Sequence, residues 1–86
     1  MRVSIPSVLQ SYTGGARVVD AHGATLSVLL AQLDVSFPGI RFRMVNEAHA
    51  LRPHVRIFVN GAPVTGLDQP LLAADEVTII QALSGG

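Results

Sequence analysis

Residues 55–61 have the sequence Val-Arg-Ile-Phe-Val-Asn-Gly. Apolar side chains recur at every second position over the first five residues, as in a strand with one face on a core. The Asn-Gly pair that follows tolerates positive φ and is a strong signal for a tight hairpin turn. The stretch therefore predicts a strand over 55–59. It also predicts a short returning strand beginning at Pro63 and Val64, where the proline favours a sheet edge.

Upstream of this strand, residues 25–40 predict the main helix. Its apolar stripe, at the spacing of one helix face, consists of Leu26, Leu29, Leu30 and Leu33. Thr25 is a suitable N-cap, and Phe37-Pro38-Gly39 ends the helix because proline cannot continue it. A short helical turn is expected around 42–45, followed by an exposed loop near 46–50.

The two ends of the chain supply the remaining strands. Residues 1–9 are expected to form a strand that pairs as a hairpin with residues 17–21, through turn chemistry at Thr13-Gly14-Gly15. A turn or short 3₁₀ segment is expected at 67–74, and Glu76 to Gln81 predicts the last strand. Asp75 is assigned a turn role, because it directly precedes this strand.

This order of elements, ββαββ with a final strand after a turn, indicates the α+β class. A right-handed connection from the hairpin through the helix is satisfied by a β-grasp (ubiquitin-like) topology, with the first and last strands adjacent and parallel. We therefore expect a mixed sheet of four to five strands packed on one main helix. Residues 1–81 are expected to form this domain, and residues 82–86 a flexible C-terminal tail ending in Gly-Gly.

The composition narrows the class of protein. The chain of 86 residues is 49% apolar and 14% charged, which fits one folded domain and excludes a disordered chain. Six arginines balance six acids, so the net charge favours neither nucleic acid nor an anionic membrane as a partner. The chain has no lysine, which makes an isopeptide chain grown on its own lysines impossible. Absence of cysteine and of a signal-peptide pattern leads us to expect a cytoplasmic protein.

No constellation of residues typical of an enzyme is present. The three histidines are too scattered for a metal motif, and no serine lies in G-x-S-x-G. A basic cluster lacks interleaved aromatic residues for base stacking and is expected to be solvated or to face a partner. The histidines are His22, His49 and His54, and the cluster consists of Arg41, Arg43, Arg52 and Arg56. We therefore expect a protein that is not an enzyme and that uses neither metal nor cofactor.

Ser84-Gly85-Gly86 follows directly after the last expected strand. A Gly-Gly end is a weak motif by itself, since it also fits a frayed terminus. On a β-grasp domain the same end is far more specific, because the ubiquitin-like carriers share that combination. Nearly the whole chain resembles the bacterial MoaD/ThiS-type sulfur carriers, especially those of an alternative cysteine biosynthesis pathway.

The resemblance rests on several stretches distributed along the chain. They are Val3-Ser4-Ile5-Pro6, Tyr12-Thr13-Gly14-Gly15, Ala24-Thr25-Leu26 continuing to Leu33, Phe37-Pro38-Gly39-Ile40, Leu51-Arg52-Pro53, Val55 to Gly61, and Asp75 to Ile80. Gln81 stands where many members carry a proline, which predicts a less stiff exit of the tail.

The resemblance implies a chemistry at the tail. An ATP-dependent activating enzyme would adenylate the carboxylate of Gly86, and a sulfur donor would convert it to a thiocarboxylate. Gly85 would provide clearance for threading a narrow channel. The sulfur would pass to an acceptor such as a cysteine synthase or a molybdopterin synthase large subunit, and a metalloprotease acting at the tail is a further implied partner.

Members of this family dock their partners on the sheet. Strand alternation places Phe58 and Ile80 on the face opposite the helix, and Pro6 on the adjacent strand is expected to complete an apolar patch leading to the tail. Within this interpretation the cysteine-biosynthesis type is preferred. The alternatives are a molybdopterin synthase small subunit, a sulfur donor for siderophore, thiamin or thio-tRNA synthesis, a ubiquitin-like modifier joined through Gly86 to target lysines, and an interaction module with inert glycines.

Overall fold

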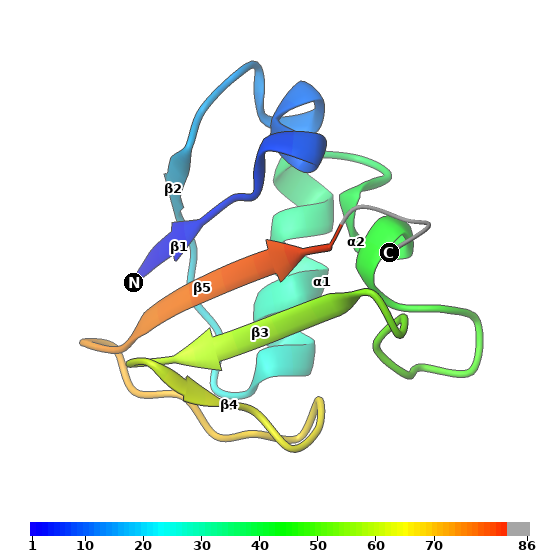
Figure 1. The fold of residues 1–86 in the computed structure, drawn as a ribbon. Helices are drawn as coiled ribbons and strands as arrows, with labels where there is room; N and C mark the ends of the chain where they lie inside the picture. The colour runs from blue at the N-terminus through cyan, green and yellow to red at the C-terminus, as the bar shows by residue number, and fades with distance from the viewer. Residues whose placement is uncertain (83–86) are drawn as a thin grey trace.

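The computed structural model describes residues 1–82, which form one five-stranded sheet with helices on one face (Figure 1). The strand order is β2-β1-β5-β3-β4. The strands are β1 (Arg2–Ser4), β2 (Val18–Asp20), β3 (Val55–Val59), β4 (Ala62–Pro63) and β5 (Glu76–Gln81). β5 pairs parallel with β1 and antiparallel with β3, so the first and last strands lie side by side within the sheet. The expected β-grasp topology is therefore confirmed.

The main helix, α1 (Leu26–Ser36), lies behind β5 and β3 in Figure 1. The Oγ1 atom of Thr25 accepts a hydrogen bond from the amide of Val28 at 3.3 Å, which satisfies one of the free amides of the first turn. Gly39, with φ of 95°, turns the chain into the short helix α2 (Ile40–Met44). The two helices are 11 and 5 residues long. Within residues 1–82, no helix has the length and apolar character needed to cross a bilayer.

The core lies between α1 and the inner face of the sheet. All four leucines of the apolar stripe are fully buried. They pack in one cluster with the inward side chains of the three central strands, which are Val3, Val55, Ile57, Val59, Val77 and Ile79. Burial of these side chains is the main stabilising contribution to a domain of this size. The alternation expected for residues 55–59 and 76–81 is confirmed.

The expected strand over residues 1–9 is wrong beyond Ser4. The chain leaves the sheet and forms a 3₁₀ helix, η1 (Ser7–Thr13), which buries Leu9. Pro6 precedes this helix and has no amide hydrogen to continue a strand ladder. β1 and β2 do pair antiparallel, but η1 connects them instead of a tight turn. Gly14, with φ of 63°, caps η1 and so serves the expected change of direction.

The hairpin between β3 and β4 is confirmed, and it is joined to the start of β5. Asn60 and Gly61 have φ of 51° and 83°, as a tight turn of this type requires. The side chain of Asn60 donates to Asp75 at 2.9 Å and accepts from the amide of Glu76 at 2.9 Å. Asp75 also accepts from the amide of Leu72 at 2.8 Å. These hydrogen bonds give Asp75 the expected turn role, and the Leu72 amide, and secondarily Asn60, lower its pKa.

Candidate functional site

The face of the sheet opposite α1 carries a strip of side chains that are partly or fully exposed. The strand registers place Val18, Ser4, Thr78, Phe58 and Pro63 in one row across all five strands. Ile80 lies on the same face, opposite Arg56, and is 48% exposed. Ile80 is therefore a diagonal neighbour of Phe58, within reach of a large side chain. Phe58 itself is partly buried, so it is less exposed than the sequence suggested.

Pro6 lies differently from the sequence-based expectation. It is two residues beyond β1, at the N-cap of η1, and is not part of the adjacent strand. Val3 and Ile5 are both buried, so the alternation directs Ser4 and Pro6 toward the outward face. Pro6 is partly exposed there. The structure thus gives an outward face with Phe58 and Ile80 at its centre, while use of these residues for docking stays a prediction.

The end of β5 determines where the tail leaves the domain. Gln81 pairs with Val55, and the amide of Ala82 donates to the carbonyl of His54 at 2.9 Å, which is the last rung of the ladder. Gly85 and Gly86 lie outside the described residues, so their roles also stay predictions. Any protein that takes up the tail must nevertheless approach this end of the sheet.

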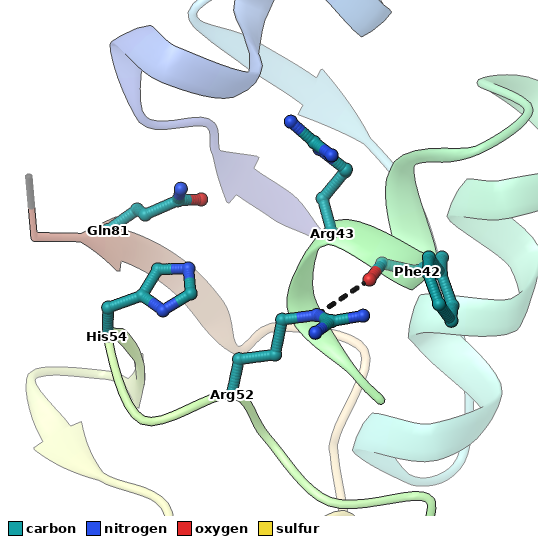
Figure 2. Close-up of a pocket in the computed structure, with 5 residues that line it drawn as sticks. All are labelled: Phe42, Arg43, Arg52, His54 and Gln81. Carbon is teal, nitrogen blue, oxygen red and sulfur yellow. Dashed lines mark hydrogen bonds between the residues drawn. The ribbon is translucent and has the colours of Figure 1, made fainter. Parts of the chain in front are cut away.

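A notch of about 310 Å³ lies beside the end of β5, on its helix side (Figure 2). Its lining residues, which we call the basic notch, are Phe42, Arg43, Arg52, His54 and Gln81. Figure 2 shows the Gln81 amide and the His54 ring on one side of this space, with Arg43 and Arg52 bordering it from the other. The sequence placed these two arginines in a wider basic cluster without indicating that they converge.

The other two arginines of that cluster point elsewhere. An Nη atom of Arg41 lies 3.2 Å from Nδ1 of His49 in the exposed loop. An Nη atom of Arg56 donates to the carbonyl of Pro53 at 2.8 Å. The basic cluster therefore divides into Arg43 and Arg52, which line the notch, and Arg41 and Arg56, which do not.

Arg52 is held in position by two contacts with Phe42. Its Nε donates to the Phe42 carbonyl at 2.8 Å, and its guanidinium carbon lies 4.6 Å from the centre of the Phe42 ring (Figure 2). Within residues 1–82, the only salt bridge joins the amine of Met1 to Asp20. No described carboxylate therefore lies within ion-pair distance of Arg43 or Arg52, and the notch is electropositive.

The described residues contain no group of three side chains suited to hold a metal ion. His22 lies in the exposed connection before α1, His49 in the loop before β3, and His54 in the basic notch. This arrangement leaves the tail and the surfaces around its exit as the candidate functional site.

Comparisons with known proteins bear on what this site does. A model of the ThiS family matches residues 3–86, which is almost the entire chain. The protein belongs to the ThiS family. This ThiS-family chain is a homologue of the sulfur carrier protein CysO of Mycobacterium tuberculosis, with 36% identity over 89 residues that cover 98% of this chain and 96% of the relative.

Solved structures agree with this assignment. The chain superposes with a TM-score of 0.91 on a chain from the BexX/CysO complex of Amycolatopsis orientalis, at 34% identity, covering 99% of this chain and 98% of that one. It also resembles SAMP1 from Haloferax volcanii, with a TM-score of 0.79, 27% identity and coverage of 100% and 98%. The resemblance inferred from the sequence and the ubiquitin-like β-grasp fold are both confirmed.

Proposed function

We propose that this ThiS-family protein is a cytoplasmic sulfur carrier, and not itself an enzyme, that bears sulfur as a thiocarboxylate on Gly86. The observation that carries the proposal is the family match over residues 3–86 together with 36% identity to the sulfur carrier CysO across nearly the full chain. The proposal is compatible with the fold, because β5 ends at Gln81 and the last five residues of the sequence follow it.

The chemistry follows from the state of the terminal carboxyl group. Such a group has an ordinary pKa of about 3.3–3.7, so at neutral pH it is an anion that resists nucleophilic attack. Attack of this carboxylate on the α-phosphorus of ATP forms an acyl-adenylate and releases pyrophosphate. Hydrosulfide supplied by the sulfur donor then attacks the carbonyl carbon; the new C–S bond forms as the C–O bond to AMP breaks, AMP leaves, and loss of the proton gives the thiocarboxylate. Gly85, without a Cβ, allows close approach of the channel walls to the reacting carbonyl.

Delivery to a separate active site requires reach and a docking surface. Residues 82–86 span roughly 16–18 Å when extended, which is enough to enter another protein's active site. The outward face around Phe58, Ile80 and Pro6 would dock both the ATP-dependent activating enzyme and the sulfur acceptor. Because the likeness to CysO is extensive, we infer an acceptor of the cysteine synthase type in preference to a molybdopterin synthase large subunit.

Intact-mass spectrometry tests the proposal directly. The protein is incubated with the activating enzyme of its source organism, ATP and a sulfur donor, and the expected product is heavier by the exchange of one oxygen for sulfur. A chain that lacks Gly86, and a chain extended by one residue, are the matched controls and should not react. Thiocarboxylation of the shortened chain, or none of the wild type, would refute the role of Gly86.

A second candidate is protein modification, which the similarity to SAMP1, a small archaeal modifier protein, favours. Conjugation would join Gly86 to lysines of other proteins, since this chain has none of its own. Peptide mass spectrometry of the source organism distinguishes the two functions, because conjugation leaves a Gly-Gly remnant on partner lysines.

A further inference from the structure

The basic notch lies beside the end of β5, on the other side of the sheet from the outward face that carries Phe58 and Ile80. Along β5 the side chains alternate, so Ile80 faces outward and Gln81 faces the helix side. The strand end thus separates the outward face from the basic notch, whose lining residues Figure 2 shows. A protein that surrounds the tail at this point meets both surfaces at once.

The notch is built to bind an anion. Arg52 is fixed by its bond to the Phe42 carbonyl and by stacking on the Phe42 ring, which leaves its two Nη groups as donors. Arg43 adds a second guanidinium, and no carboxylate of residues 1–82 pairs with either one. A planar guanidinium with fixed direction binds a carboxylate through two parallel hydrogen bonds, and prior fixing lowers the entropy lost on binding.

Gln81 lines the notch without adding charge to it. Its Oε1 is the one buried side-chain polar atom within residues 1–82 that has no hydrogen-bond partner, and because this atom is buried a ligand in the notch does not reach it. The two guanidinium groups therefore define the ligand, and they favour the carboxylate of an aspartate or glutamate.

We propose that the basic notch binds an aspartate or glutamate side chain of the activating enzyme, at the mouth of the channel that receives the tail. The proposal rests on the proposed function and adds a second contact to the outward face. The anion at the notch is not the nucleotide. Adenylation takes place at Gly86, five residues beyond Gln81, so ATP lies roughly 16–18 Å from the notch when the tail is extended.

Steady-state adenylation, followed by pyrophosphate release with the activating enzyme of the source organism, tests the proposal. Arg43→Gln and Arg52→Gln should each raise the KM for the carrier about tenfold, because each removes one of the two guanidinium groups that pair with the carboxylate of the enzyme. The kcat should be unchanged, since neither arginine reaches the reacting carboxylate. Arg2→Gln is the matched control, because it removes the same charge from a site far from the notch. Arg2 lies on β1, opposite Glu76 at the start of β5 in the strand register, and its replacement should leave KM unchanged.

Two further variants separate ion pairing from structural effects. Arg52→Lys keeps the charge but loses the planar fork and should recover only part of the lost affinity. The exposed side chain of Arg43 makes no hydrogen bond within residues 1–82, so Arg43→Gln should unfold at the same temperature as the wild type. The KM of the wild type should rise with ionic strength more steeply than that of the Arg43→Gln, Arg52→Gln double variant.

The outcomes distinguish this proposal from the function on which it rests. No adenylation of the wild type would refute the proposed function, and the role of the notch with it. Normal adenylation of the wild type with equal KM for the double variant and Arg2→Gln would overturn the notch proposal alone. A change in the NMR signals of the Arg43 and Arg52 side chains on removal of Gly85 and Gly86 would assign the notch to the chain's own terminus, and would also overturn it.

Discussion

Ile79 and Ile80 are neighbours on β5 with opposite surroundings, being 2% and 48% exposed. Replacement of each by aspartate tests the assignment of the docking face within one pair of variants. Ile80→Asp places a charge that stays hydrated in the free protein, so the domain should fold with a loss of about 1 kcal/mol or less from the lower strand propensity of aspartate. Ile79→Asp buries the same charge in the core.

The effect on binding can be estimated from the exposed fraction of Ile80. Full burial of an isoleucine side chain contributes about 1.5–3 kcal/mol, so its exposed half contributes about 0.7–1.5 kcal/mol in a complex. An unpaired polar group left in an apolar interface costs about 1–3 kcal/mol more. The sum of about 1.7–4.5 kcal/mol corresponds to a loss of affinity of about 15- to 1,600-fold.

Isothermal titration calorimetry with the activating enzyme measures this loss, and thermal unfolding reports on the fold. Ile79→Asp should lower the free energy of unfolding by about 5 kcal/mol or more, which is a large part of a total stability of about 4–13 kcal/mol. If Ile80→Asp also unfolds the domain, the outward face has been assigned wrongly. If Ile80→Asp folds and its affinity falls by less than tenfold, the enzyme binds the tail or the basic notch without contacting Ile80.

Three further predictions concern the domain itself. Leu30→Ala, at a fully buried site, should lower the free energy of unfolding by about 2–5 kcal/mol in a denaturant titration. Val35, also on α1, is 82% exposed, and Val35→Ala should change the free energy of unfolding by less than about 0.5 kcal/mol. Gly23→Ala would place a Cβ 2.5 Å from the Leu29 amide nitrogen, and thermal unfolding should show a loss of about 1–3 kcal/mol. The lowered pKa of Asp75 stabilises the fold above its ordinary pKa, and this contribution is lost as the pH falls through the folded-state value. The difference in melting temperature between wild type and Asp75→Asn should therefore shrink below about pH 4; a constant difference would contradict it.

The sequence predicted well those elements in which the spacing of apolar residues reflects contact with one neighbouring element. Residues 55–59 and 76–81 alternate because one face meets α1, and the leucine stripe of α1 meets that same face. The expected strand over residues 1–9 was wrong in its length. Val3 and Ile5 do alternate as in a strand, but from Ser7 the chain forms a 3₁₀ helix outside the sheet. Local alternation carries no information on where pairing ends.

The basic notch could not be predicted from the sequence in the same way. Arg43 and Arg52 come together because the loop of residues 46–50 closes back on itself, with the Asn46 amide donating to the Ala50 carbonyl at 3.0 Å. Gln81 joins them only because it is the last inward position of β5. These contacts depend on tertiary structure, whereas the sequence showed only that positive charge is frequent between residues 41 and 56.

The position of β5 has a mechanical consequence. A tail that is pulled along the axis of its strand loads both neighbouring ladders lengthwise, because β5 is bonded to β1 on one side and to β3 on the other. In this shear geometry the hydrogen bonds share the load and must break together, whereas an edge strand such as β4 would peel away one rung at a time. An enzyme that draws the terminus into a channel would therefore load the sheet in the direction in which it best resists unfolding.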